Sequence, residues 1–358
     1  MSTKMVAVEA LTPGTVLGEA VLSASGKVLL AKDVVLTSRA ISLLNMWAVN
    51  CVYICDEEEQ EELQKTENTS GYTGSQSQSN MAAECTKFFQ EYDQAVTTVS
   101  QSFDFIRSQK KVPVLQLKDA AFGIYSSILT SSVAFMYLLI SDYKLADAVS
   151  RHSVMVAFIA GMIGRQLEMS EDEIKKLTLA GLLHDIGKLV YDPGKPANPK
   201  DHVVNGVMLL KDIKSFSPEV LLAVLQHHEC IDGSGFPTGV GESKIHIFAK
   251  IIAVADIFHS QAYDGEYSNP FPVLDVLIKE MFGKLDPIVC HPFINRVRDS
   301  LMHNYILLND GREAEVVFFH PNNSGFPVVK TKDGEFIDLA ARSAIKVNHV
   351  LAPEYFPQ

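Results

Sequence analysis

The central stretch of the chain, residues 81–302, carries helix signals almost throughout, and this limits the fold to one that is mainly α. Ser170, followed three residues later by Glu173, has the spacing of a capping box, which marks the start of a helix. Further helices are predicted over residues 219–229, 272–282 and 287–302. Apolar residues make up 47% of the 358, enough to bury a sizeable core, so global disorder is excluded.

Shorter segments with strand character flank this stretch on both sides. Residues 1–55 are predicted to form a small α+β module: two strands around the turn Ser25-Gly26, a short helix from Thr37 or Ser38 to residue 46, and a strand over 50–54. Residues 304–358 change to a strand-like period, interrupted by Asp310-Gly311 and Asp333-Gly334, and are predicted to form a β-rich extension. Strands are expected over residues 305–308, 314–320, 327–331 and 336–339.

A linker is predicted between the first module and the helices. Six of the seven residues in 56–62 are acidic, and a stretch rich in Ser, Gln, Asn and Gly follows to residue 80. The expected organisation is therefore an N-terminal module (1–55), an acidic and polar linker (56–80), a helical domain (81–303) and a C-terminal extension (304–358).

Charge and cysteine content limit the partners and the compartment. The chain has 31 basic and 43 acidic residues, a net charge of −12, which argues against binding large nucleic acids. The five cysteines are scattered and odd in number, as expected of a protein in a reducing cytoplasm. Residues 120–141 are uncharged and long enough to span a bilayer, but hydroxyl side chains crowd their middle. We therefore expect a buried helix there and no membrane span.

Histidines and aspartates in the helical stretch are the candidates for chemistry. His184 and Asp185 end an apolar helix, and Lys188 follows one turn later. A buried His beside a carboxylate is costly unless the two are paired or bind a metal. The full candidate set is His152, His184, Asp185, His202, His227, His228 and Asp256.

Each of these residues alone has an ordinary structural interpretation. A single His on an apolar helix is more often a hydrogen-bonded core residue than a ligand, and Asp256 alone fits a carboxylate that packs between helices. Together, five His and two Asp from separate helices favour a site for Fe, Mn or Zn. The absence of Cys from the set argues against a closed structural zinc site.

The order and approximate spacing of these residues resemble the HD-GYP family, within the HD superfamily of metal-dependent phosphohydrolases. The resemblance covers residues 143–293 and rests on the sequences around His184-Asp185 and Lys188, on His227-His228-Glu229, on the loop 232–237 and on Asp256. It implies an HD-type helical bundle and a phosphodiesterase that hydrolyses cyclic di-GMP to pGpG or GMP in bacterial signalling. It also implies a cytoplasmic protein whose partners include a GGDEF-type or other signalling protein.

The resemblance further implies a role for each residue. His152, His184, Asp185 and Asp256 would hold one divalent metal, and Asp185 would bridge to a second, held by His202, His227 and His228. The metals would be iron or manganese, and water activated between them would attack the phosphodiester. Lys188 would contact a phosphate oxygen, and Gly235, Phe236 and Pro237 would contact substrate. Catalysis would therefore fall to Asp185 and Lys188.

The chain also departs from the family pattern. Phe236 stands where the family has Tyr, so a hydroxyl is lost. The two arginines that contact substrate phosphate in relatives are replaced by Gly265 and Ser268. Losing a guanidinium at an anionic ligand costs about 1.5–3 kcal/mol. Ala148 replaces the Glu of relatives with three metals, so two metals are expected.

Three functions stay open on the sequence alone. The first is hydrolysis of cyclic di-GMP or a related cyclic dinucleotide. The second is a degenerate module that binds a nucleotide without turnover, and the third is an HD phosphohydrolase acting on another nucleotide or phosphoester. The complete ligand set with Lys188 favours the first, whereas the missing arginines favour the other two.

Overall fold

The computed structural model describes residues 3–8, 11–12, 14–22, 28–30, 36, 41, 44, 49, 51–55, 73–131, 134–140, 148–190, 198–263, 268–320 and 323–352. The chain divides into two compact units, residues 1–77 and 78–358, and each is described by itself. The predicted turn at Ser25-Gly26 and Gly265 lie outside the described residues, as do most of the helix predicted to end at 46 and most of the linker.

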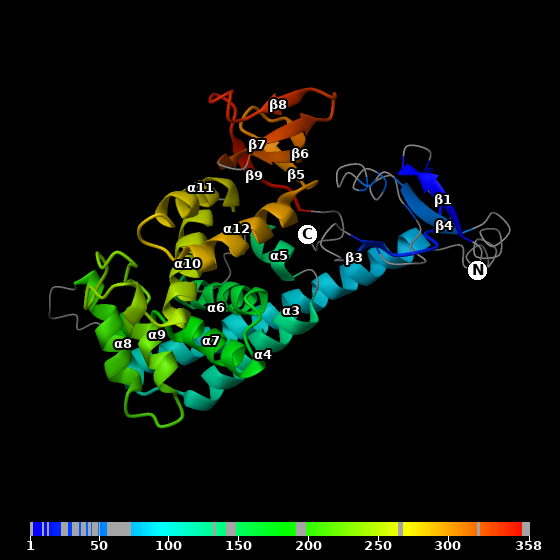
Figure 1. The fold of residues 1–358 in the computed structure, drawn as a ribbon. Coiled ribbons are helices and arrows are strands. Elements are labelled where there is room, and N and C mark those ends of the chain that lie inside the picture. Colours follow the sequence, from blue (N-terminus) through cyan, green and yellow to red (C-terminus); the bar gives the residue numbers. More distant parts are fainter. Residues whose placement is uncertain are drawn as a thin grey trace. The chain divides into compact units, whose positions relative to one another are not determined.

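The first unit contains two short antiparallel strand pairs. Strand β1 (Thr3–Ala7) pairs with β4 (Cys51–Cys55), and β2 (Val21–Leu22) pairs with β3 (Val28–Leu30) (Figure 1). The strand predicted over 50–54 is confirmed as β4, and the two predicted hairpin strands are confirmed as the shorter β2 and β3. A small apolar core that includes Leu17 and Val52 holds the described part of this unit together.

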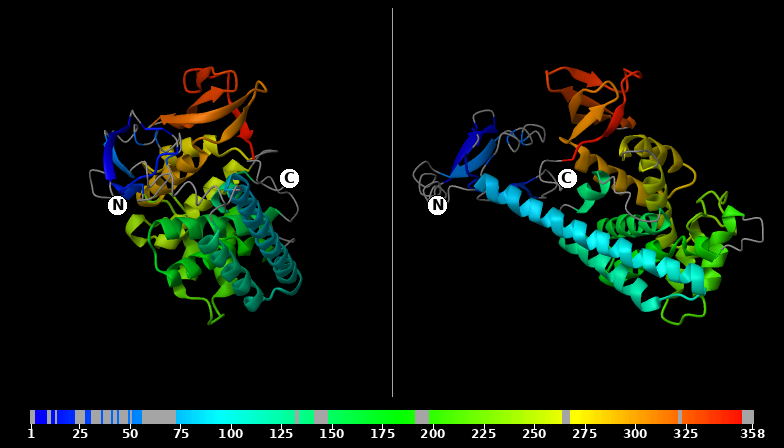
Figure 2. Two further views of the ribbon diagram at one scale, coloured as in Figure 1. Left: turned by 90° about the vertical axis from the view of Figure 1, so that its right-hand side faces the viewer. Right: turned by 180° about the vertical axis from the view of Figure 1, so that it is seen from behind.

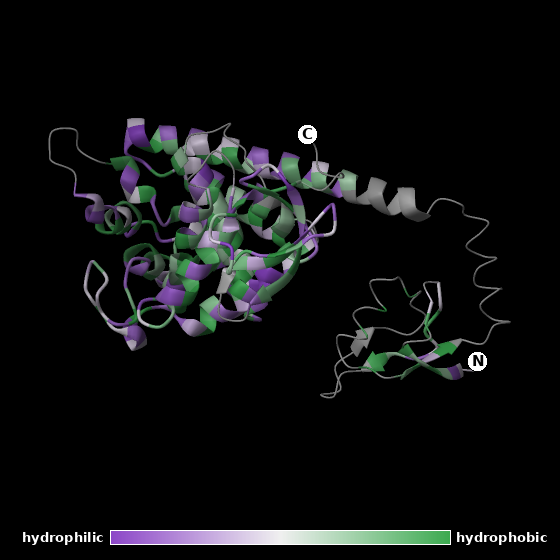
Figure 3. Cartoon of the chain, turned by 90° about the horizontal axis from the view of Figure 1, so that it is seen from above, coloured by the Kyte–Doolittle hydropathy of each residue, from purple (hydrophilic) through white to green (hydrophobic). Residues whose placement is uncertain are grey.

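The second unit is built mainly of α-helices, as predicted (Figure 1). Its α-helices are α3 (Thr73–Gln109, which begins in the first unit), α4 (Val114–Thr130), α5 (Ala134–Ile140), α6 (Ala148–Gln166), α7 (Glu171–Leu183), α8 (His202–Leu210), α9 (Pro218–Gln226), α10 (Ile247–Ala262), α11 (Pro270–Glu280) and α12 (Pro287–Leu301). Three short 3-10 helices accompany them: η2 (Ile186–Val190), η3 (Pro199–Asp201) and η4 (Glu242–Lys244). Hydrophobic and hydrophilic segments alternate along the helices (Figure 3), as expected where one face of each helix is buried.

Two sequence predictions about helix boundaries are wrong. The linker does not extend to residue 80, because α3 begins at Thr73. Relative to Ala, each Ser, Gln or Asn makes helix formation less favourable by only about a few tenths of a kcal/mol. A helix that is packed further along the chain can therefore extend through such a stretch. The helix predicted over 219–229 ends at Gln226, where His227 forms the C-cap.

The uncharged segment 120–141 also differs from its prediction. It forms the end of α4 and then a separate α5, rather than one buried helix. Helix α4 lies beside α3 (Figure 2), and the Ser127 hydroxyl donates to Glu91 across this contact at 2.6 Å. Within the described part of the chain, no helix combines the length and the apolarity needed to cross a membrane.

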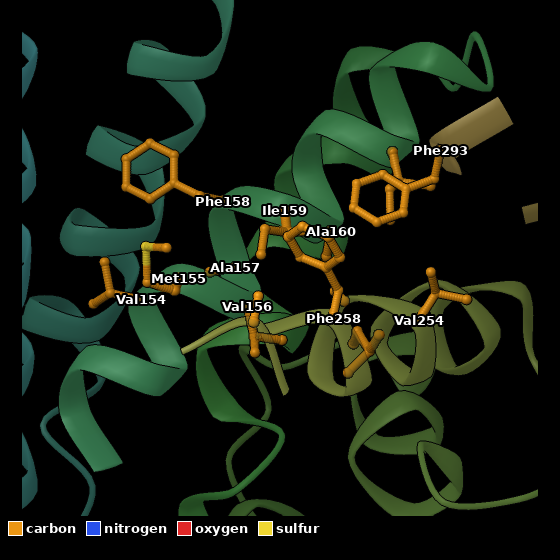
Figure 4. Packing of buried hydrophobic residues seen from close by; sticks show 14 of the residues in the cluster. Val154, Met155, Val156, Ala157, Phe158, Ile159, Ala160, Val254, Phe258 and Phe293 are labelled. Carbon is orange, nitrogen blue, oxygen red and sulfur yellow. The ribbon is translucent and has the colours of Figure 1, made fainter. Parts of the chain in front are cut away.

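Helix α6 runs through the middle of the helical core. Phe158 points to one side of α6 (Figure 4). Its ring centroid lies 5.4 Å from that of Phe88 on α3. Phe258 of α10 and Phe293 of α12 pack edge to face at 5.0 Å on another side of α6. Because α3, α10 and α12 pack against α6, the polar residues of α6 are held in fixed positions.

The C-terminal extension is β-rich, as predicted. Strands β5 (Tyr305–Leu308), β6 (Glu313–His320), β7 (Asn323–Thr331), β8 (Phe336–Asp338) and β9 (Val347–Val350) form one sheet in the order β8-β7-β6-β5-β9. Gly311 and Gly334 have φ values of 87° and 90°, which explains the two predicted Asp-Gly turns. The sheet contacts α11, where the Asp275 carboxylate accepts from the Gly325 amide at 2.9 Å.

The loop after α7 approaches α8 closely because residue 187 is glycine. A Cβ atom at Gly187 would overlap the carbonyl oxygen of His202 and lie 2.6 Å from the amide nitrogen of Gly206. Both are backbone atoms of α8, so the overlap cannot be relieved by a side-chain rotation. Gly187 therefore fixes the distance between η2 and α8.

We expect Gly187→Ala to lower the free energy of unfolding by about 1–3 kcal/mol, since the added methyl group forces two backbones apart. The matched control is Gly123→Ala on α4, where a Cβ would meet nothing within 4 Å. The control should be neutral or stabilising by about 0.5–1 kcal/mol. Urea denaturation measures both, and equal stability of the two variants would contradict this account.

Candidate metal centre

The seven predicted ligand residues come from five helices and meet in one place. His152 lies on α6 and Asp256 on α10, whereas His184 caps the C-terminus of α7 and Asp185 follows it. His202 begins α8, and His227 with His228 follows the last turn of α9. Helix ends bring most of these side chains together because the chain turns there and can approach other helices.

The first group contains His152, His184 and Asp256, whose ligand atoms lie within 4.8 Å of one another. His152 Nε2 is 3.1 Å from His184 Nε2 and 3.2 Å from Asp256 Oδ1. The His184 side chain is fully buried, and the other two are 16% exposed, so the group borders on solvent. Two imidazoles and a carboxylate at this spacing can hold one divalent cation.

The second group contains His202, His227 and His228, whose ligand atoms also lie within 4.8 Å of one another. His202 Nε2 is 3.3 Å from His227 Nε2. His202 and His227 are buried, whereas His228 is partly exposed. This group can hold a second cation.

Asp185 lies between the two groups. Its Oδ2 is 3.4 Å from His184 Nε2 and 3.6 Å from His152 Nε2. Its Oδ1 is 3.3 Å from His202 Nε2 and 3.9 Å from His227 Nε2. Among the described residues, this buried Oδ1 has no hydrogen-bond donor, a costly state for a carboxylate oxygen. A carboxylate that faces both groups has the geometry needed to bridge two metals.

Backbone carbonyls fix which nitrogen of three histidines carries the proton. The Nδ1 atoms of His184, His202 and His227 lie 2.8, 2.6 and 3.0 Å from the carbonyl oxygens of Gly181, Pro199 and Val224. A carbonyl cannot donate, so each Nδ1 must be the N–H, and each neutral ring keeps a lone pair on Nε2. The Nε2 lone pairs of His202 and His227 then face each other at 3.3 Å, which is repulsive unless a cation lies between them. The residues therefore fit a metal site.

The charges of the site also favour metal binding. Burial opposes ionisation of Asp185, but the attraction of protonated His184 and of Lys188 outweighs burial and holds the pKa of that carboxyl well below its usual value. The same attraction raises the pKa of His184, although burial of the ring opposes this. Burial lowers the pKa of His228 to about 4 and lowers the pKa values of His202 and His227 as well. At neutral pH these imidazoles are uncharged and Asp185 is ionised, which are the forms that bind metals.

Two cations flank the ligands. Lys188 Nζ donates to Asp185 Oδ2, and its side chain is 41% exposed. Lys200 Nζ lies 5.1 Å from the ring centroid of Phe236. The Phe236 ring stacks on His228 at a centroid distance of 4.7 Å. Phe236 therefore lies between the candidate ligand His228 and the exposed Lys200.

The loop that carries Phe236 is held by Glu229. The amide and the hydroxyl of Thr238 donate to Glu229 Oε1 at 2.7 and 2.6 Å. A Cβ on Gly235 would overlap backbone atoms of Glu229 and Cys230, so this glycine serves the packing of the loop. Pro237 is exposed. Substrate contacts by Gly235, Phe236 and Pro237 stay predictions.

The structure adds two observations, on His259 and Ser268, that the sequence analysis did not provide. His259, which that reasoning did not select, lies 2.8 Å from His152, Nδ1 to Nδ1. Its position one turn after Asp256 on the same helix is the signal that could have found it. Ser268, for which the sequence predicted the position of an arginine in relatives, is buried and donates to the Leu139 carbonyl at 2.8 Å. It supplies no cation to the site.

Comparisons with known proteins show which proteins this chain is similar to. Residues 135–271 match the family model described as "HD domain". The chain is 28% identical over 267 residues to a cyclic di-GMP phosphodiesterase of Pseudomonas aeruginosa, covering 71% of this chain and 63% of the relative. It is 32% identical over 209 residues to a cyclic di-GMP phosphodiesterase of Thermotoga maritima, covering 53% and 56%.

A third relative and a solved structure extend the comparison. A 3'3'-cGAMP-specific phosphodiesterase of Vibrio cholerae is 30% identical over 193 residues, covering 49% of this chain and 42% of the relative. The chain thus spans less than two thirds of the length of these three relatives. A solved HDG"Y"P protein from Bdellovibrio bacteriovorus shares the fold, with a TM-score of 0.50 and 20% identity, covering 83% of this chain and all of the other.

We expect Asp185→Asn to reduce the number of metal ions bound, because the amide keeps the shape of the carboxylate but loses the charge that faces both groups. Elemental analysis after loading with Mn²⁺ measures the bound metal. Asp172→Asn is the matched control, since Asp172 is an exposed acid on α7 that pairs with Lys176. If the Asp185 variant binds as much Mn²⁺ as the control, Asp185 does not bridge the two groups.

Proposed function

We propose that the chain is a metal-dependent phosphodiesterase of the HD-GYP type, since residues 135–271 match the HD-domain model and the curated relatives include cyclic di-GMP phosphodiesterases. Its substrate in this proposal is cyclic di-GMP or a related cyclic dinucleotide, opened to the linear dinucleotide pGpG or cleaved to GMP. The observation that carries the proposal is the position of Asp185, whose two oxygens face two separate groups of histidines.

The proposed ligand assignment follows the two groups. His152, His184 and Asp256 hold one metal, and His202, His227 and His228 hold the other, while Asp185 contacts both. Two divalent ions in such a site lower the pKa of bound water and neutralise charge on the phosphodiester. Imidazole and carboxylate ligands suit iron and manganese, which we propose as the metals.

Other residues of the chain act on the substrate directly. Lys188, which extends from η2 beside Asp185, contacts a phosphate oxygen and stabilises the negative charge that grows as the phosphate is attacked. Lys200 provides a second cation near the second group, and the Phe236 ring offers an apolar surface between Lys200 and His228. Lys200 would supply part of the charge that the missing arginines provide in relatives, whereas Lys188 belongs to the motif that this chain shares with the family.

The nature of the substrate is supported by the relatives. The Pseudomonas and Thermotoga proteins are cyclic di-GMP phosphodiesterases, and the Vibrio protein is specific for 3'3'-cGAMP. Both compounds are cyclic dinucleotides with two phosphodiester bonds. The cytoplasmic location and the GGDEF-type or other signalling partner stay predictions from the sequence.

A second candidate function is nucleotide binding without turnover. It is favoured by Ser268, which is tied to the Leu139 carbonyl in the core and leaves a phosphate-binding position without a cation. In this case the metals and Lys188 would bind a cyclic dinucleotide but fail to orient the phosphate for attack.

The two candidates are separated by incubating Mn²⁺- or Fe²⁺-loaded protein with cyclic di-GMP, 3'3'-cGAMP and a generic phosphodiester. Products are followed by chromatography, and affinity is measured by calorimetry. We expect pGpG or GMP from cyclic di-GMP, or the corresponding linear product from 3'3'-cGAMP. Tight binding of either compound by metal-loaded protein, with no product, would support the second candidate and reject the first.

We expect Lys188→Ala to keep the bound metal and to lower kcat by at least about tenfold, because a charge-assisted contact to phosphate is worth about 1.5–3 kcal/mol. The matched control is Lys175→Ala on α7, where the lysine pairs with Glu171 away from the site. Steady-state kinetics and metal content are measured for both. An unchanged kcat in the Lys188 variant would contradict the proposed contact between Lys188 and the phosphate.

A further inference from the structure

His152 differs from His184, His202 and His227 in the partner of its Nδ1 atom. The Nδ1 atoms of His184, His202 and His227 each face a backbone carbonyl oxygen, which can only accept a hydrogen bond. His152 instead faces a side chain, the imidazole of His259, at 2.8 Å between the two Nδ1 atoms. The orientation and the tautomer of His152 therefore depend on a residue that substitution can change.

The surroundings of His259 hold its ring in place. The residue is only 8% exposed, and it lies on α10 one turn after Asp256. Its ring stacks on that of Tyr263 with a centroid distance of 4.8 Å and an angle of 20°. Its ring centroid is 4.9 Å from that of His152. A buried ring that is stacked on one neighbour and hydrogen-bonded to another is a rigid support.

The chemistry of the pair has two alternatives, and they differ in their consequence for metal binding. If His259 donates, His152 carries its proton on Nε2 and directs it at Asp256 Oδ1, 3.2 Å away, so it has no lone pair for a metal. If His259 accepts, His152 carries its proton on Nδ1, and its Nε2 lone pair faces His184, Asp185 and Asp256. Only the second arrangement makes His152 a ligand.

We propose that His259 is a positioning residue that accepts the Nδ1 proton of His152 and so holds His152 in the tautomer that binds metal in the first group. The inference rests on the proposed metal-dependent function. It assigns a role to His259, a residue that the sequence analysis did not select. A hydrogen-bond partner of a metal-bound His typically changes metal affinity about 10–100-fold when it is removed.

Two substitutions separate hydrogen bonding from packing. His259→Phe keeps an aromatic ring against Tyr263 but removes the acceptor. His259→Asn loses the ring but keeps an acceptor, since Asn Oδ1 occupies the same covalent position as His Nδ1. The Asn variant thus serves as the conservative rescue.

The experiment titrates Mn²⁺ into chelator-treated wild type and both variants by calorimetry, and elemental analysis then counts the bound metal. We expect wild type to bind two Mn²⁺, and the Phe variant to bind one of the two about 10–100-fold more weakly. The Asn variant should stay within a few times the wild-type affinity. Thermal unfolding of the metal-free variants checks that all three proteins are folded.

Several outcomes would overturn the inference. If the Phe variant binds both ions as tightly as wild type, His259 has no role in metal binding. If the Asn variant is as weak as the Phe variant although both are folded, the contribution is packing and not the acceptor. If wild type itself binds no Mn²⁺ or Fe²⁺, the proposed function fails first, and the role of His259 fails with it.

Discussion

The whole site depends on one buried carboxylate placed between imidazoles that turn their lone pairs inward. Asp185 has its oxygens within 3.3–3.9 Å of four imidazole nitrogens, and one of these oxygens lacks a donor among the described residues. By itself, this arrangement leaves a buried carboxylate oxygen without a donor and turns imidazole lone pairs toward one another, and both are unfavourable. Cations resolve both problems at once, and this is why the arrangement points to metals rather than to a hydrogen-bonded core.

The fold holds this arrangement in place by the way in which the helices end and approach one another. The carbonyls of Gly181 and Val224 lie in the last turns of α7 and α9, and each orients the histidine that follows its helix. Such carbonyls have no partner within their helix, so the same unsatisfied groups that end a helix also fix a ligand. Gly187 lets η2 approach α8, which sets the distance between Asp185 and His202. The site therefore requires the helices to keep their relative positions.

The exposed edge of the candidate site is less constrained by the fold than its buried centre. Four of the seven candidate ligands, His184, Asp185, His202 and His227, are buried, whereas Lys188, Lys200 and Phe236 lie on short helices and a loop at the edge. Changes at such positions alter recognition at little cost to the core. Ser268, by contrast, is buried in the core and donates to the Leu139 carbonyl.

The sequence by itself determined the mainly helical fold, the β-rich C-terminal extension and the set of candidate ligands. Capping at Ser170 and the Asp-Gly turns are local signals, so they could be recognised from neighbouring residues. Strand β9 was missed because it is held by pairing with β5, some forty residues away, and local periodicity does not report such contacts. Likewise, α3 began earlier than its composition indicated, since helix propagation depends on packing further along the chain.

Only the tertiary structure decided how the candidates are grouped and what supports them. The division into two groups with Asp185 between them depends on distances between five helices, which no spacing along the chain encodes. The role of His259 became visible only through its contact with His152, 107 residues earlier in the chain. Local sequence records which side chains are available, whereas packing determines which of them meet. The reason is physical: a ligand set is defined by directions and distances in space, and these are fixed only when the core closes.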